Sequence, residues 1–491
     1  MNITATVSDP ILKLSQPKAR PAVGARGADQ GHDIFPLPLG HYERYMLADD
    51  TPAYPMVFTI AIDLSGTLRR GAFESALQAA LLRHPILHCR IARIRGRGWC
   101  WQPFPEFAPE LDWDAGQGSL DCPRGRQIDL TREIGLRIAV RHDRTIARVS
   151  FQFHHAATDG LGAMRFIGDW LGIYGQLTAA TGVEVPELEP VNLELLKHRS
   201  QLWPTGDKPR RGFLARTVCR VLQFLSQMPV PLAPPSRSRG RPAGEQQLPP
   251  FVTRKLPRDV YKGLKDEAAA RGATVNDLLV LDMFQTIREW NRQHGRNAEG
   301  GWYRIGVPLS LRTPLEDELP AANVLSFLFL TRRARDCDPQ RDREDELLSY
   351  VHRETETVVQ GEARLMFTYG AGLLLKVPGL LAGLLRVPAC QATAILANVG
   401  DVRRQFHVRF PLKNGRCVAG NVTLEALLGA APIRDKTRIA VSLGTYAGVL
   451  LVNMQCDPRF FTLSEAEQLA DLFAERIRRR SRSEVLLERA A

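Results

Sequence analysis

The segment Phe151-Gln-Phe-His-His-Ala-Ala-Thr-Asp-Gly-Leu161 is the most informative part of this 491-residue chain. It contains His154, His155, Asp159 and Gly160 in an H-H-x-x-x-D-G pattern. Given the residue frequencies of the chain, chance produces such a match in on the order of one in a thousand chains of this size. The alternative interpretation, two histidines that merely cap the end of a strand, requires no aspartate or glycine at these positions.

The residues around the pattern predict a loop between a strand and a helix. Apolar and polar residues alternate over residues 146–153, which is typical of a strand. Residues 164–174 then carry apolar side chains at helical spacing. A loop at such a junction can present side chains to a binding site.

The residue types indicate proton transfer. Imidazole has a pKa of about 6.5, so a neutral histidine can accept a proton at cellular pH. Alternation along the strand places His154 and His155 on opposite sides, and we expect only His155 to face reacting groups. Asp159 can fold back under the loop and hold it through hydrogen bonds or an arginine.

Strand and helix patterns alternate in both halves of the chain, which predicts a mixed α/β fold. We expect strands at residues 56–64, 86–94, 135–142, 146–153, 303–311, 324–332, 420–427 and 438–455. We expect helices at residues 73–83, 164–174, 257–271, 274–294 and 464–480. The similar order of elements indicates two related subdomains.

Four segments follow from these patterns. Residues 1–33 lack the apolar core of a signal peptide and are predicted to be a flexible leader. Residues 34–196 form the subdomain with the H-H-x-x-x-D-G motif, and residues 251–485 form the second subdomain. Residues 197–250, rich in proline, connect them.

The net charge of +12 is concentrated in the connecting segment. Residues 197–250 contain ten Lys or Arg and two Asp or Glu, and so contribute +8. A nucleic-acid-binding face across the whole fold is therefore excluded, whereas an acidic protein, an anionic lipid or a phosphate-bearing cosubstrate fits. Within this segment residues 214–225 form an amphipathic helix, either a simple crossover or a helix that docks on a carrier protein or an anionic membrane.

The eight cysteines are scattered, with no C-x-x-C pair, which indicates reduced thiols in a cytoplasmic protein. No stretch of 18 uncharged apolar residues exists, so any membrane association is peripheral. The acidic residues at 336–346 lack the spacing of a metal loop, and we predict no metal site.

The motif resembles that of the chloramphenicol-acetyltransferase-like acyltransferases, which include peptide condensation domains, wax ester synthases, alcohol acyltransferases and polyketide-associated acyltransferases. Further short segments are similar to theirs: Arg83-His-Pro-Ile-Leu-His-Cys-Arg90, Ile305 to Arg312, Asn323 to Phe327, and Asn398-Val-Gly400. The resemblance covers about residues 35–480.

This resemblance implies two similar subdomains, a pseudo-dimer, with an active-site tunnel between them. It implies transfer of an acyl group from acyl-CoA, or from a phosphopantetheinyl acyl carrier protein, to an alcohol or amine. By position in the motif, His155 matches the catalytic base and Asp159 the structural aspartate, with His154 in support. Gly160 would allow a tight turn and a close backbone approach. The sequence has no G-x-S-x-G, G-x-x-x-x-G-K-[ST], H-E-x-x-H or G-x-G-x-x-G motif, so we expect catalysis without a bound cofactor or a covalent enzyme intermediate.

One departure concerns the residue that pairs with the aspartate. Condensation domains usually carry an arginine where this chain has His88, and Arg90, two residues on, is the candidate substitute. We further expect Arg312 and Asn398 to bind substrate. The departure, and the absence of carrier or adenylation segments, argue against a standard peptide-condensation domain.

Two questions stay open at this stage. The chain could instead be a non-catalytic, condensation-like module that docks a carrier protein or a partner enzyme. The apolar residues 373–385 could line a channel for a long acyl chain or form a buried core helix.

Overall fold

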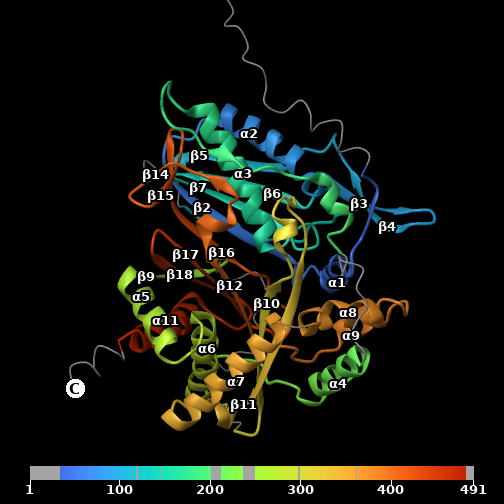
Figure 1. Cartoon of the computed structure of the whole chain (residues 1–491), viewed down its shortest axis with the longest axis vertical. Coiled ribbons are helices and arrows are strands. Elements are labelled where there is room, and N and C mark those ends of the chain that lie inside the picture. Colours follow the sequence, from blue (N-terminus) through green and yellow to red (C-terminus); the bar gives the residue numbers. More distant parts are fainter. Residues whose placement is uncertain are drawn as a thin grey trace, which may run out of the picture.

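A computed structural model describes residues 34–117, 120–143, 145–200, 212–235, 249–296, 299–360 and 362–482. Its elements form two α/β halves, each with one large sheet, stacked along the long axis of the molecule (Figure 1). This is the predicted mixed α/β class with two subdomains. The predicted leader 1–33 lies outside the described residues.

The sheet of the N-terminal half has seven strands. Their order is β14 (Leu412–Lys413), β15 (Arg416–Ala419), β16 (Val422–Ala430), β2 (Val57–Gly66), β7 (Ile146–His154), β6 (Leu136–His142) and β5 (Glu110–Gln117). The expected strands at 56–64, 135–142 and 146–153 are thus confirmed as β2, β6 and β7.

The sheet of the C-terminal half has six strands. Their order is β11 (Leu325–Arg333), β10 (Trp302–Ser310), β12 (Ala394–Asp401), β17 (Ile439–Tyr446), β18 (Val449–Cys456) and β9 (Val252–Leu256). The remaining strands form two small sheets. One contains β1 (Leu37–Pro38), β4 (Gly98–Pro103) and β3 (Cys89–Ile94), in this order. The other is the pair β13 (Val408–Arg409) and β8 (Glu187–Leu188).

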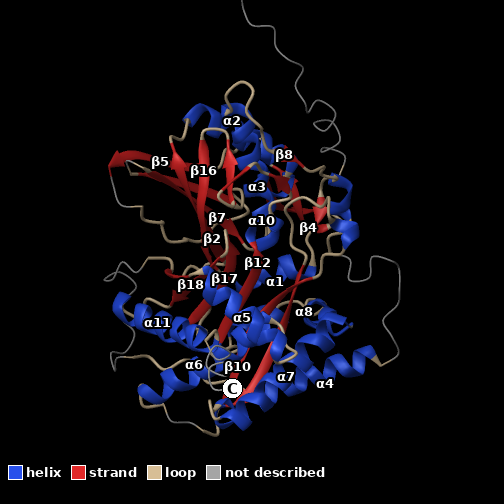
Figure 2. Cartoon of the chain, turned by 60° about the vertical axis from the view of Figure 1, so that its left-hand side comes forward, coloured by secondary structure: helices blue, strands red, loops and turns tan. Residues whose placement is uncertain are grey.

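The helices lie mainly on the outer faces of these sheets (Figure 2). They are α1 (His41–Asp49), α2 (Arg70–Arg83), α3 (Gly160–Thr178), α4 (Phe213–Ser226), α5 (Arg258–Ala270), α6 (Val275–Gln293), α7 (Arg341–Gln360), α8 (Met366–Leu374), α9 (Leu380–Arg386), α10 (Val402–Gln405) and α11 (Leu463–Arg480). No helix in the described part of the chain is both long and apolar enough to cross a membrane.

Strand β16 joins the two halves, although it follows the C-terminal strands β10 to β12 in sequence. It pairs antiparallel with β2 from Val422 opposite Gly66 to Ala430 opposite Thr59. The strand pattern at 420–427 is confirmed, but the sequence did not predict its place in the other sheet. Because β16 belongs to the first sheet and the next strand, β17, belongs to the second, the chain passes directly from one sheet to the other. The boundaries at 196 and 251 remain predictions.

The apolar core beneath the N-terminal sheet is built on aromatic side chains of α3 and β7. The Trp170 ring centroid lies 5.3 Å from that of Phe151 and 4.9 Å from that of Phe73 on α2. These rings are fully buried. They hold the first turn of α3, and with it the motif loop, against the end of β7.

Three expected elements differ from the structure. The segment 438–455, expected as a strand, is the antiparallel hairpin of β17 and β18, because the chain turns at Ala447 and Gly448, both with positive φ. The strand expected at 86–94 begins only at Cys89, because Pro85 starts a short 3₁₀ turn over Pro85–His88. The apolar segment 373–385 is not a single buried core helix: it spans α8 and α9, with Leu380 and Leu384 exposed and Leu381 buried. None of its residues lines the cavity between the two halves.

Candidate active site

The H-H-x-x-x-D-G motif forms the loop between β7 and α3, as the sequence predicted. Strand β7 ends at His154 and α3 begins at Gly160. The loop closes through a turn in which the Ala157 N–H donates to the His154 carbonyl over 2.9 Å. Asp159 is the N-cap of α3, and its Oδ1 accepts a hydrogen bond of 2.8 Å from the Gly162 N–H.

The second carboxylate oxygen of Asp159 binds the other half of the molecule. Oδ2 accepts 2.8 Å from Arg312 Nη1 and 2.9 Å from the Val324 N–H. Burial tends to raise the pKa of this carboxyl, but the Arg312 charge and these hydrogen bonds outweigh burial and lower it. Asp159 is therefore ionised, and both of its carboxylate oxygens accept hydrogen bonds. It links the two halves and does not transfer a proton.

His155 lies beside this aspartate and is held by its own backbone. Its N–H donates 2.7 Å to the Met56 carbonyl, and its own carbonyl accepts 2.8 Å from Asn323 Nδ2. The ring lies 4.9 Å from the Phe58 ring and 6.0 Å from the Tyr42 ring. Burial lowers the pKa of His155, and the nearby Asp159 charge offsets this only in part. A neutral imidazole, able to accept a proton, is favoured at neutral pH.

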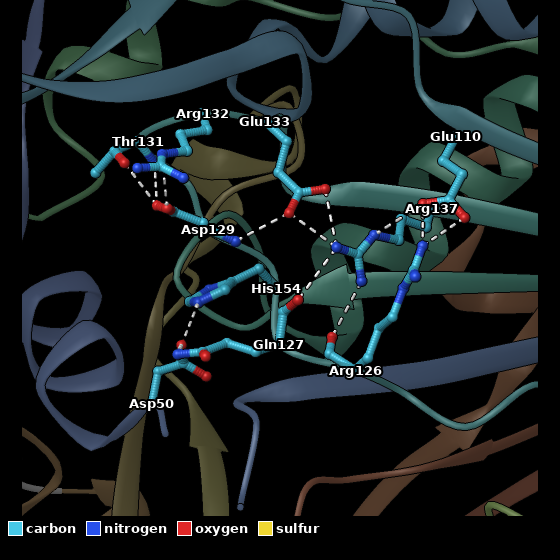
Figure 3. A network of polar contacts seen from close by, with 10 residues as sticks. All are labelled: Asp50, Glu110, Arg126, Gln127, Asp129, Thr131, Arg132, Glu133, Arg137 and His154. Atoms are coloured by element: carbon cyan, nitrogen blue, oxygen red, sulfur yellow. Dashed lines mark hydrogen bonds and ion pairs between the residues drawn. The ribbon is translucent and has the colours of Figure 1, made fainter. Parts of the chain in front are cut away.

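His154 points the other way and is buried, as the alternation along the strand predicted. Its Nδ1 accepts 3.0 Å from the Ala156 N–H, and its Nε2 lies 3.8 Å from Asp50 Oδ2. Figure 3 shows Gln127 next to them, with its side chain 2.6 Å from the same Asp50 oxygen. The Gln127 carbonyl accepts 3.1 Å from Arg137. His154 thus packs within a structural polar network behind the strand.

A cavity of about 660 Å³ lies in front of His155, between the two halves. His155, Asp159 and Gly160 line it together with Arg312 and Asn398. Most of the wall is apolar and comes from both sheets: Met56, Phe58, Ile60, Leu309, Phe327, Phe329, Ile395, Leu427 and Leu443. A mostly apolar cavity with a few convergent polar groups is typical of a small-molecule site.

The expected role of Arg90 is not what the structure shows. The Arg90 guanidinium lies 4.6 Å from the Phe104 ring, and His88 Nε2 lies 2.9 Å from the Phe107 carbonyl. Neither residue contacts Asp159, whose arginine is Arg312, 153 positions along the chain. Arg312 was expected to bind substrate; it lines the cavity, but its guanidinium is engaged by Asp159 and by the Ala322 carbonyl at 2.9 Å.

Gly160 also differs from its expected role. Its φ is not positive, and a Cβ placed there meets no heavy atom within 4 Å. The close approach is at Gly162, where a Cβ would lie 2.9 Å from the backbone N and O of Ala322. Gly162, two residues past the motif, therefore allows the halves to touch, whereas Gly160 leaves open space at the cavity.

Asn398 lies on β12 at the rim of the cavity. Its Oδ1 accepts 3.0 Å from the Gly400 N–H and its Nδ2 lies 3.4 Å from Asn276 Oδ1. The position is compatible with the expected contact to substrate, which remains a prediction. Among the described residues, no group of three or more His, Cys, Asp or Glu side chains is arranged to hold a metal ion.

Two features of the site escaped the sequence reasoning. The Ala321 N–H donates 2.8 Å to His84 Nδ1, so the opposite nitrogen carries the hydrogen and donates 3.0 Å to Asp169. This second bridge between the halves uses the histidine of the Arg83-His84-Pro85 segment. Tyr42 is the other feature: it is buried beside His155, and its hydroxyl has no hydrogen-bond partner among the residues described.

The sequence and the fold were compared with those of known proteins. No family model matches the sequence. The Mycobacterium tuberculosis protein Rv2305, which is uncharacterised, is 26% identical over 307 residues, 60% of this chain and 67% of its own length.

Solved structures show the fold over nearly the whole chain. The starter condensation domain of rhizomide synthetase RzmA, solved with C8-CoA and Leu-SNAC, has a TM-score of 0.62 at 13% identity and covers 93% of this chain and 97% of its own. The trichothecene 15-O-acetyltransferase TRI3 of Fusarium sporotrichioides has a TM-score of 0.62 at 12% identity, covering 90% and 94%. The chain therefore has the same fold as these two proteins.

Proposed function

We propose that this protein is an acyltransferase that moves an acyl group from a thioester to a hydroxyl or amine. The observation that carries the proposal is His155, a histidine with a lowered pKa on the wall of an apolar cavity between two halves. The condensation-like fold supports the same class of transfer, and the complex of RzmA with an acyl-CoA supports acyl-CoA or an acyl carrier protein as donor.

In the proposed reaction His155 acts as general base. Its free ring nitrogen takes the proton from the acceptor O–H or N–H while the acceptor oxygen or nitrogen attacks the thioester carbonyl carbon. The carbonyl oxygen becomes an oxyanion in the tetrahedral intermediate. When the intermediate collapses, the C–S bond breaks and the imidazolium returns the proton to the thiolate, which leaves as a free thiol.

The oxyanion needs a hydrogen-bond donor, and Tyr42 is the residue that we propose for it. Its ring centroid lies 6.0 Å from that of His155, and its buried hydroxyl has no hydrogen-bond partner among the described residues. Burial raises the pKa of this tyrosine, so the hydroxyl keeps its proton and can donate. A preorganised donor in a dry site stabilises developing charge far more than one in water.

The remaining groups position the base. Asp159 and Arg312 hold the motif loop against the second half, and Asn323 fixes the His155 carbonyl from that half. The apolar wall favours an acyl chain or an apolar acceptor over a polar one, because desolvation of a polar chain is not repaid there.

Release of free thiol tests the proposal. Purified protein is incubated with acyl-CoAs of rising chain length and with alcohol or amine acceptors, and product masses are recorded. We expect acceptor-dependent thiol release that falls about 100-fold or more in His155→Ala. His88→Ala, a histidine 2.9 Å from a carbonyl outside the cavity, is the matched control and is expected to retain turnover.

Full turnover in His155→Ala would contradict the mechanism. If no acyl-CoA reacts, the same acyl groups loaded on a carrier protein are tested next. Tight carrier binding without transfer, in a folded protein, would replace the enzyme proposal by the docking module.

A further inference from the structure

Helix α4 carries an apolar face that is turned to solvent. Leu214, Val218, Val221, Leu222 and Leu225 recur at helical spacing and are all exposed, with Leu222 at 61%. The opposite side packs on the body: Phe213 and Thr217 are buried, and the Phe224 ring lies 5.1 Å from that of Phe329. Exposed apolar stripes of this length on a soluble fold usually mark an interaction surface.

A second exposed apolar segment lies next to this helix. Val377, Leu380, Leu384 and Val387, from the α8–α9 hairpin, are between 39% and 53% exposed. The Phe213 ring at the start of α4 lies 5.2 Å from that of Tyr369 on α8. In Figure 1, α4 lies below α8 and α9 on the right-hand side of the C-terminal half, and Figure 2 also shows α4 below α8. The two segments therefore form one continuous surface, which we call the α4–α9 surface.

The charge of this surface has a single sign. Residues 212–235 and 363–400 contain no Asp or Glu. They contain five basic residues, namely Arg216, Arg220, Arg364, Lys376 and Arg386. From a neighbouring element, Glu354 of α7 contacts Arg220 at 3.1 Å. Apolar side chains flanked by cations, with no acidic residue between them, match the boundary of an anionic bilayer, where apolar groups enter the acyl region and cations meet lipid phosphates.

We propose that the α4–α9 surface docks on an anionic lipid bilayer with α4 lying in the plane of the membrane. A bilayer fits better than an acidic carrier protein, because the stripe is aliphatic along the whole helix, about 21 Å at 1.5 Å per residue. A protein partner would need polar groups matched to its own backbone and side chains at the contact.

The surface also lies directly behind the wall of the cavity. The Phe224 ring contacts Phe329, whose ring lies 5.7 Å from that of Phe327, and both of these line the cavity. Docking through α4 therefore brings the apolar cavity of the protein to the membrane, the location of lipophilic acyl chains and alcohols. Binding to the bilayer does not depend on the proposed chemistry and is measured without it.

Vesicle sedimentation with the full chain tests this inference. Vesicles of phosphatidylcholine alone are compared with vesicles containing phosphatidylglycerol, at low and at high salt. The double variant Leu222→Glu/Leu225→Glu adds two charges to the exposed stripe. The matched control, Leu82→Glu/Leu177→Glu, adds the same charges at two leucines of the N-terminal half that are 65% and 54% exposed.

We expect the wild-type protein and the control to sediment with the anionic vesicles, less so at high salt. The α4 double variant is expected to lose about 10-fold or more of this binding, because two leucines no longer bury apolar area and two anions oppose the lipid charge. Thiol release from a soluble donor should be the same in all three proteins, which separates this result from any failure of the proposed function.

Three results would overturn the inference. The first is wild-type protein that stays in solution with anionic vesicles. The second is equal loss of binding in the two double variants, and the third is equal binding to neutral and anionic vesicles. Binding of an acidic carrier protein that depends on Leu222 and Leu225, without vesicle binding, would assign the surface to a protein partner instead.

Discussion

Each half of the molecule contains an antiparallel hairpin followed by a loop and a long helix, yet only one of these units carries the H-H-x-x-x-D-G motif and borders the cavity. In the N-terminal half the unit is β6–β7–α3, and in the C-terminal half it is β17–β18–α11. Both helices have a side-chain N-cap, Asp159 for α3 and Thr462 for α11. Helix α3 is buried nearly all round and contacts elements from the second half, whereas α11 buries one face only.

A buried aspartate in each loop shows the electrostatic side of this difference. Asp159 has a lowered pKa because Arg312 of the other half and two backbone N–H groups outweigh its burial. Asp457, which directly follows β18, has its pKa raised by burial to about 6, despite hydrogen bonds from Arg459 and Tyr54. In the first unit the surroundings of the aspartate therefore stabilise its charged form, whereas in the second unit burial disfavours the charged form.

This difference shows that the motif loop borders a cavity only because the second half of the molecule packs against it. The hairpin and the cap are local features that recur in both units. The cavity, the Arg312 contact and the Asn323 contact exist only where α3 and its loop face the second half.

Substituting the two aspartates should give the largest contrast. Asp159→Asn leaves the Arg312 guanidinium, 8% exposed, without its ion pair, so we expect the free energy of unfolding at pH 7 to fall by about 3–5 kcal/mol. Asp457→Asn removes a charge that burial disfavours and is expected to leave this free energy equal or higher. Urea unfolding measures both. Equal losses in the two variants would contradict the distinction.

The pH dependence of the Asp457 effect should follow its raised pKa. A carboxyl whose pKa is higher in the folded state adds stability below its unfolded pKa of about 3.9, and this stability is lost as pH rises through about 6. From pH 4 to pH 7 the wild-type protein should therefore lose up to about 3 kcal/mol relative to Asp457→Asn. Unfolding curves at several pH values measure this, and a difference that is constant with pH would refute the assignment.

Substitution of two tyrosines compares a hydroxyl that has no hydrogen-bond partner with one that donates a hydrogen bond. Tyr42→Phe removes an unpartnered hydroxyl beside the motif, so we expect unchanged or slightly higher stability and about a 100-fold loss of kcat. Tyr54→Phe removes a hydroxyl that donates 3.0 Å to Asp457, so we expect about 1 kcal/mol lower stability and unchanged kcat. Thermal unfolding and thiol release distinguish the two, and full turnover in Tyr42→Phe would exclude it as the oxyanion donor.

The smallest effect is expected at the cap of α11. Thr462 accepts 3.3 Å from the Glu465 N–H, and Thr462→Ala should cost about 1 kcal/mol of stability. Turnover should not change, because this helix lies outside the cavity. A loss of kcat comparable to that of His155→Ala would show that the second unit takes part in the chemistry after all.

Most of the local structure could be predicted from the sequence because it depends on short-range patterns. Period-two alternation located β2, β6 and β7, and helical spacing located α2, α3, α4 and α11. The orientations of His154 and His155 followed from the same alternation. The error at residues 86–88 was also local, since the turn imposed by Pro85 interrupts an apolar run.

Pairings over long separations could not be predicted. Arg90 was expected to pair with Asp159, and Arg312 was expected to bind substrate, because sequence reasoning compares residues along a strand and cannot measure distances across an interface. The place of β16 in the first sheet, the open space at Gly160 and the free hydroxyl of Tyr42 belong to the same class.

Residue chemistry and local periodicity are properties of the chain alone, so the sequence was sufficient for the mixed α/β class, the loop that carries His155, and the basic segment around α4. Close contact between the halves is a property of packing. It arises from hydrogen bonds and ion pairs between residues more than a hundred positions apart, and so the cavity, the pairing of Asp159 with Arg312 and the exposed α4–α9 surface emerged only when the chain was folded.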